Sequence, residues 1–154
     1  MEFDINGNLT TYEIIYTDWA TFKAEFVDAF PRSSTRQVIF QSFSVYMEKL
    51  VTIIGTDFHQ WIDGSFVTRK LNPNDIDFVT FANAKTFSRN EHALSNLREY
   101  SREQSLHLDG YFVKDYPTDH KHFIRSYLDS KQWIHEFIRD SRKGQSKGFV
   151  QLDY

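Results

Sequence analysis

The chain of 154 residues contains no cysteine. This absence excludes disulfides, zinc-thiolate sites, iron–sulfur clusters and thiol nucleophiles together. Any metal ion that the protein binds must therefore be held by oxygen or imidazole ligands.

Proline and glycine are scarce, with three and six residues. No repeat, low-complexity tract or Pro/Gly/Ser linker interrupts the chain, so we expect one domain over residues 1–154. No apolar run approaches the ~20 residues of a membrane span, and the N-terminus MEFDINGN lacks the basic and apolar stretches of a signal peptide. These absences predict a cytosolic protein that does not enter the membrane.

Neither sign of charge dominates: 18 Lys and Arg face 21 Asp and Glu, and the formal net charge is −3. Nucleic-acid binding driven by the overall charge of the protein is therefore not expected. The distribution is uneven, because residues 1–113 hold 10 basic and 15 acidic side chains whereas residues 114–154 hold 8 and 6. An acidic body with a basic final section suits a site that holds both cations and phosphates.

Aromatic residues are abundant, at 17% of the chain, and most fall at helical or strand spacing that predicts core packing. Apolar residues at the 3.6-residue period predict a long helix from a cap at Ser33/Ser34 to Gly55. Shorter helical patterns cover residues 19–30, the segment that a capping box at Ser88–Glu91 opens, and residues 123–138.

Short runs rich in β-branched and aromatic residues predict strands at residues 58–63, 75–81 and 106–113, and an edge strand at 149–152. Asn6-Gly7 indicates a turn with a small hairpin. The resulting order of helices and strands predicts an α/β (α+β) fold, in which helices pack on a mixed β-sheet.

The most informative stretch for chemistry is Asp75-Ile76-Asp77-Phe78. Side chains alternate along a strand, so Asp75 and Asp77 are expected on one face while Ile76 and Phe78 point to the core. Two carboxylates on one rigid strand repel each other unless a divalent cation lies between them. Oxygen ligands of this kind suit Mg²⁺ or Mn²⁺ bound together with substrate phosphates. Asp109, in the next strand, is the candidate for a third carboxylate of a phosphoryl-transfer site.

Gly64-Ser65 directly follows a predicted strand and precedes the acidic pair by nine residues. Glycine lets the backbone approach a phosphate closely, and the amides of a following turn can bind it together with the Ser65 hydroxyl. Arg69 and Lys70 follow, where at least one is expected to neutralise triphosphate charge. Each feature alone is weak, whereas their combination indicates a nucleotide-binding site.

Gly-Ser, a gap of this length and Asp-hydrophobic-Asp resemble the signature of the nucleotidyltransferase superfamily with the DNA polymerase beta-like fold. More narrowly, residues 62–68, 73–77 and 147–150 are similar to a family of small bacterial nucleotidyltransferase-like proteins. Asp63 departs from the superfamily pattern, in which a hydrophobic residue usually precedes the glycine. Larger members add a helical domain that binds the acceptor or the base, so substrate recognition here is expected from the chain's own helices or from a partner.

The resemblance implies that Asp75 and Asp77 hold Mg²⁺ or Mn²⁺, that Asp109 completes the cluster and assists deprotonation of the acceptor, and that Gly64 and Ser65 grip nucleotide phosphates. The implied activity transfers an NMP group from an NTP to an acceptor hydroxyl on a protein, an RNA or a small molecule. The alternative is a binding module: an inactive nucleotidyltransferase-like fold, of the antitoxin type, that senses nucleotide without turnover.

Other side chains have simpler interpretations. Trp61 is expected in the core, with nucleobase stacking as the alternative. The His120-x-His122 spacing places the two rings on different sides of a helix and offers no third ligand, which argues against zinc. A solvated segment is the simplest interpretation of the basic residues near the end of the chain, with contact to an RNA or nucleotide acceptor as the alternative: Arg139, Arg142, Lys143 and Lys147.

Overall fold

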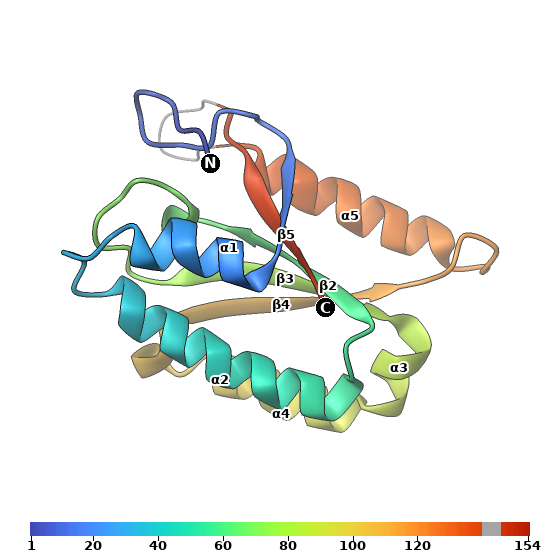
Figure 1. Cartoon of the computed structure of the whole chain (residues 1–154). Helices are drawn as coiled ribbons and strands as arrows, with labels where there is room; N and C mark the ends of the chain where they lie inside the picture. The colour runs from blue at the N-terminus through green and yellow to red at the C-terminus, as the bar shows by residue number, and fades with distance from the viewer. Residues whose placement is uncertain (140–145) are drawn as a thin grey trace.

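The computed structural model describes residues 1–139 and 146–154. Five strands of this part form one mixed sheet: β1 (Ile14–Thr17), β2 (Phe58–Asp63), β3 (Ile76–Asn83), β4 (Leu108–Asp115) and β5 (Phe149–Asp153). Their order in the sheet is β1–β5–β2–β3–β4 (Figure 1). The pairs β1/β5 and β3/β4 are parallel, whereas β5/β2 and β2/β3 are antiparallel.

The helices are α1 (Trp19–Lys23), α2 (Arg36–Ile54), α3 (Ala84–Arg89), α4 (Glu91–Ser101) and α5 (Phe123–Phe137). A π-helical turn η1 (Ala24–Asp28) continues α1, and two 3-10 turns are η2 (Ser65–Val67) and η3 (Gln104–Leu106). Together with the mixed sheet, these helices confirm the predicted α+β fold. Within the described residues, every helix is too short or too polar to cross a membrane.

The two faces of the sheet are covered by different helices. α1, α2 and α4 lie on one face, where they enclose the larger core around Phe22, Phe43 and Phe78 (Figure 1). α5 lies on the other face, over a smaller core that includes Trp61 and Phe149. Because side chains alternate along each strand, every strand contributes to both cores.

Three sequence-based expectations differ from the structure. The last strand is not an edge strand, because β5 lies between β1 and β2, and Phe149 and Val150 are fully buried. The sequence pattern does not predict β1, whose four residues carry too short an alternation. Ser88 does not open a helix but lies inside α3, because the Asn83 side chain caps that helix earlier by accepting from the Lys85 amide at 2.9 Å.

The other elements agree with expectation within a few residues. α2 begins just after the Ser33/Ser34 pair and ends at Gly55. The small N-terminal hairpin forms through the bridge between Phe3 and Leu9. β2 and β3 are adjacent antiparallel strands, which brings the segment after β2 next to the start of β3.

Candidate active site

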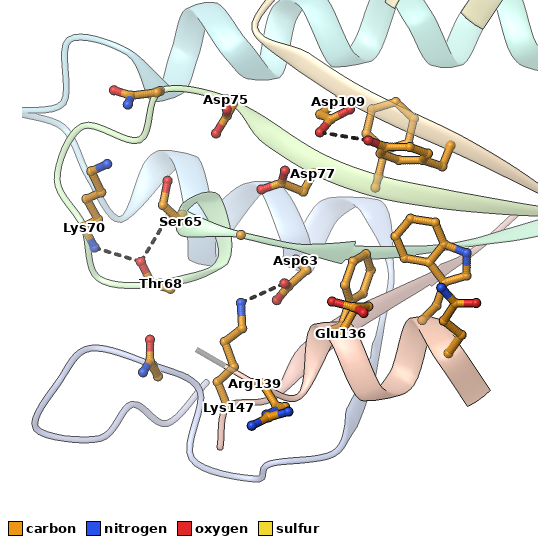
Figure 2. A pocket seen from close by; sticks show the side chains of 18 residues that line it. Asp63, Ser65, Thr68, Lys70, Asp75, Asp77, Asp109, Glu136, Arg139 and Lys147 are labelled. Carbon is orange, nitrogen blue, oxygen red and sulfur yellow. Dashed lines mark hydrogen bonds and ion pairs between the residues drawn. The ribbon is translucent and has the colours of Figure 1, made fainter. Parts of the chain in front are cut away.

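Asp63, Asp77 and Asp109 lie side by side on three neighbouring strands. Asp63 of β2 is opposite Asp77 of β3, and Asp77 is opposite Asp109 of β4. Neighbouring strands are about 4.8 Å apart and paired residues point to the same face, so the three carboxylates share one face of the sheet. We refer to these three residues as the acidic row (Figure 2).

Gly64 turns the chain from β2 into η2 beside the acidic row. It adopts φ +77° and ψ −165°, a backbone conformation that is essentially reserved for glycine. Thr68 stabilises the segment that follows: its hydroxyl donates to the Ser65 carbonyl at 2.8 Å and accepts from the Lys70 amide at 3.2 Å. Ser65 and Lys70 are thereby held at the same end of the acidic row.

Arg36, at the start of α2, anchors this segment from the protein interior. Its side chain is fully buried, and its guanidinium donates to the carbonyls of Phe66, Thr68 and Lys70 at 2.6 to 2.7 Å. A further bond at 2.6 Å reaches the carbonyl of Phe26. Burial lowers the pKa of Arg36 to about 10, so it remains charged at neutral pH. Four carbonyl oxygens solvate a buried cation and fix the backbone around the Gly64-Ser65 turn.

Asp77 is the electrostatic centre of the acidic row. Burial raises the pKa of its carboxyl to about 7, with further contributions from Asp75, Asp63 and Asp109, while Lys147 acts in the opposite direction. A carboxyl with this pKa is partly protonated at neutral pH. A nearby divalent cation would favour its charged form and relieve the repulsion.

Lys147 provides one positive charge within the site. Its ammonium donates to Asp63 Oδ2 at 2.7 Å, and the two side chains are only 12% and 9% exposed. This buried ion pair neutralises Asp63 directly. The remaining repulsion is centred on Asp75, Asp77 and Asp109.

A cleft of about 650 Å³ lies over the acidic row. Basic side chains line it opposite the carboxylates, namely Lys70, Arg139 and Lys147 (Figure 2). Aromatic rings of Tyr111 and Trp133 line it as well. Further lining residues are Asn8, Gly64, Ser65, Thr68, Asn74, Asp75, Phe78, Gln132, Glu136 and Phe137.

The carboxylates of the cleft are the hard oxygen ligands that Mg²⁺ and Mn²⁺ prefer. Within residues 1–139 and 146–154, however, no three His, Asp or Glu side chains converge closely enough to hold an ion by themselves. Mg²⁺ usually binds through one or two carboxylates and completes its coordination with water and substrate phosphates. The donor set therefore fits an ion that Asp77 and one neighbouring aspartate would hold together with phosphate groups.

Most of the residues predicted from the sequence line this cleft: Gly64, Ser65, Lys70, Asp75, Asp77 and Asp109. Asp75 lies one residue before β3 rather than within it. Arg69 is different, because its guanidinium lies over the Phe3 ring at 5.1 Å and its amide donates to the Gly7 carbonyl at 2.8 Å. Arg69 thus anchors the N-terminal hairpin, and its position gives no support to a role in phosphate binding.

Asp63 is the site residue that the sequence interpretation treated only as a departure from a motif. Alternation along β2 places it on the face opposite Ile62, and its pairing with Asp77 could be anticipated once the two strands are assumed to be antiparallel neighbours. Tyr111 follows Asp109 by two residues on β4, so alternation places it on the same face, and it lines the cleft. Trp133 and Glu136 come from α5, and their place over this end of the sheet has no local sequence signal.

The structure also gives the positions of Trp61 and of the basic residues near the end of the chain. Trp61 is in the core, as expected: it is 5% exposed and its indole N–H donates to Gln151 Oε1 at 2.7 Å. Arg139 and Lys147 line the cleft, so a solvated segment does not describe Lys147. Two other basic residues of that group lie outside the described residues, namely Arg142 and Lys143.

Comparison with known proteins gives a family for almost the entire chain. Residues 1–153 match the family described as "Family of unknown function (DUF6932)". The chain belongs to this family. No curated protein and no solved structure shows a significant match. The DUF6932 assignment names no activity, so a function has to be argued from the geometry and chemistry of the cleft.

Proposed function

We propose that this DUF6932 protein is a metal-dependent nucleotidyltransferase that moves an NMP group from an NTP to an acceptor hydroxyl and releases pyrophosphate. The observation that carries the proposal is the acidic row lying beside the Gly64-Ser65 turn in one cleft. Carboxylates and a phosphate-binding turn at one place are what phosphoryl transfer requires, because it depends on positioning and on charge stabilisation.

Ser65 and Lys70 would bind the β- and γ-phosphates of the nucleotide. The Ser65 hydroxyl can donate to phosphate oxygens, and the Lys70 ammonium supplies a compensating charge. Arg139 lies across the cleft and can approach the same phosphates (Figure 2). Arg36 supports this end indirectly, because it fixes the backbone that carries both side chains.

Asp77 would hold Mg²⁺ or Mn²⁺ together with Asp75 or Asp109, and the ion would supply Lewis-acid stabilisation of charge on the phosphates. Asp109 would accept the proton of the acceptor hydroxyl. A bond then forms between the acceptor oxygen and the α-phosphorus, the bond from the α-phosphorus to the bridging oxygen breaks, and pyrophosphate leaves. Asp109 is exposed on the edge strand β4, a position that an acceptor can reach from solvent. The acceptor is a hydroxyl of a protein, an RNA or a small molecule.

A second candidate is an inactive nucleotidyltransferase-like module of the antitoxin type, which binds nucleotide without turnover. Two observations favour it: in the described part of the chain, no three carboxylates converge on a single ion position, and Asp63 already pairs with Lys147. Such a protein would bind NTP through Ser65 and Lys70 and act through a partner protein.

The test is Mg²⁺-dependent release of pyrophosphate and transfer of label from each of the four NTPs to candidate acceptors. Asp77→Asn should lower the rate by at least about 100-fold, the usual effect of losing one key electrostatic group. Asp129→Asn, on the exposed surface of α5, is the matched control and should keep the parent rate.

Equal rates of pyrophosphate release for Asp77→Asn and the parent chain would overturn the proposed enzymatic activity. Thermal stabilisation by Mg²⁺–NTP without turnover would favour the binding module, since a ligand at 100 times its Kd adds about 2.7 kcal/mol to the free energy of unfolding. Neither turnover nor stabilisation by any NTP would overturn both candidates.

A further inference from the structure

Tyr111 and Trp133 form an aromatic wall at one end of the cleft. Tyr111 follows Asp109 by two residues on β4, so it projects from the same face of the sheet. Its ring centroid is 5.0 Å from that of Trp133 on α5, at an interplanar angle of 51°. Both side chains line the cleft, and Tyr111 is 36% exposed. We call these two residues the aromatic wall.

The rings of the aromatic wall differ in accessibility from other aromatic side chains on this face. Trp61 and Phe149 are buried under α5, and the Trp61 indole N–H is already bonded to Gln151. Trp133 is only partly buried: it packs on Phe137 at 5.3 Å on one side and lines the cleft. The aromatic wall therefore presents ring surface to a ligand, whereas Trp61 does not.

The position of the aromatic wall relative to the charged groups matches the order of groups in a nucleotide. The Gly64-Ser65 turn follows β2, and Tyr111 lies on β4, so the acidic row separates the phosphate-binding end from the rings. β2 and β4 are two strand spacings apart, about 9.6 Å, and the position of Tyr111 two residues beyond Asp109 adds about 6.6 Å along the strand direction. A nucleotide has the same order of groups, with a planar base at one end, phosphates at the other and a sugar between them.

We propose that the aromatic wall binds the base of the nucleotide, so that one NTP spans the cleft from Lys70 to Trp133. This inference rests on the proposed nucleotide-binding function and adds the recognition of the base to it. Stacking on aromatic rings accepts every base, because each base has a π-face. Gln132 and Glu136 are close to Trp133 in the sequence of α5 and also line the cleft, so they can provide an amide and a carboxylate for the edge of the base.

The experiment compares Mg²⁺–ATP with Mg²⁺–tripolyphosphate, which has the phosphates but no base, by calorimetric titration of the full chain. The parent chain should bind ATP at least about 10-fold more tightly, a difference of about 1.4 kcal/mol. Tyr111→Leu and Trp133→Leu should each remove most of this preference and leave the Kd for tripolyphosphate unchanged. Tyr127→Leu is the matched control, because Tyr127 is an exposed aromatic residue of α5 outside the cleft lining.

Equal affinities for ATP and tripolyphosphate in the parent chain would overturn the base subsite and leave the proposed phosphate site intact. A full ATP preference in Tyr111→Leu would also overturn it. If Trp133→Leu does not fold, Tyr111→Leu decides alone, since its side chain is the more exposed of the two. Failure of the parent chain to bind either ligand would overturn the proposed function and the subsite with it.

Tryptophan fluorescence gives a second readout that does not depend on turnover. ATP stacked on the aromatic wall should quench Trp133, and Trp133→Phe should lose this quenching while retaining an ATP preference. The buried Trp61 should contribute no ATP-dependent change. Undiminished quenching in Trp133→Phe would place the base elsewhere and overturn the inference.

Discussion

The carboxylate of Asp77 fills the space that a side chain on Gly64 would need. A Cβ built on Gly64 would overlap Asp77 Oδ2 and lie 2.8 Å from the Cγ of Asp77. The missing side chain therefore serves two purposes: it permits the left-handed backbone of the turn, and it lets the central carboxylate of the acidic row pack against the turn.

Gly64→Ala should separate these two effects when it is compared with Gly55→Ala. Gly55 has nearly the same backbone, φ +75° and ψ −152°, but a Cβ there would meet nothing within 4 Å. Gly55→Ala should cost about 1 to 3 kcal/mol of unfolding free energy from backbone strain alone. Gly64→Ala should cost about 1 to 3 kcal/mol more, because Asp77 must move. Urea unfolding measures both, and equal costs would contradict the packing argument.

Arg36→Met should destabilise the protein by at least about 3 kcal/mol, because buried carbonyl oxygens lose their donor. It should also weaken binding of tripolyphosphate, since the backbone carbonyls of Phe66, Thr68 and Lys70 are no longer held. Arg32→Met, at an exposed position nearby, should stay within about 0.5 kcal/mol of the parent. Chemical unfolding and calorimetry provide the two readouts, and an Arg36→Met chain as stable as the parent would refute the anchoring role.

Asp77 should make the protein less stable as the pH rises. Its pKa is raised from 3.8 to about 7 in the folded chain, so the folded state binds the proton more tightly than the unfolded state. The Asp77 contribution to the free energy of unfolding is therefore present at low pH and is lost between about pH 4 and pH 7. Asp77→Asn should remove this slope and be more stable than the parent at pH 8 by at least about 1.4 kcal/mol, the equivalent of one pKa unit.

Urea unfolding between pH 5 and pH 8, with and without Mg²⁺, tests this prediction. Mg²⁺ should stabilise the parent chain more at pH 8 than at pH 5, because only ionised carboxylates bind it. Parallel stability curves for the parent and Asp77→Asn would show that the carboxyl titrates normally.

Asp63 and Lys147 should be strongly coupled in their contributions to the free energy of unfolding. Lys147→Met removes the ammonium that donates to the buried Asp63 carboxylate and should cost about 3 to 5 kcal/mol. Asp63→Asn combined with Lys147→Met should recover much of that loss, because both charges of this pair are then removed together. A double-mutant cycle of unfolding free energies measures the coupling, and simple additivity of the two single costs would contradict it.

Local patterns predict much of this fold. The apolar period of α2 and the composition of β2 and β3 are strong signals, and the elements form within a few residues of the expected bounds. The place of β5 between β1 and β2 has no such signal, because it depends on pairing between residues 88 to 135 positions apart. The short β1 exists only through its partner β5.

Sequence patterns likewise predict some residues of the candidate site and miss others. Asp77, Asp109 and the Gly64-Ser65 turn are visible because each follows from a motif or from alternation within one strand. The ion pair of Asp63 with Lys147 joins segments 84 residues apart. Arg69 and Lys70 illustrate the limit of sequence reasoning, since adjacent residues with the same charge point to different places: one to the hairpin at Phe3 and the other to the cleft.

The place of β5 between β1 and β2 has a consequence for folding during synthesis. Until residues 149–153 are translated, β1 has no neighbour to bond with, and one edge of β2 stays open. Lys147 precedes this strand, so a nascent chain that stops before it also lacks the ammonium that pairs with Asp63. An open strand edge is a template for aggregation. Insertion of β5 is therefore expected to complete the sheet and to form the Asp63–Lys147 pair in one folding step.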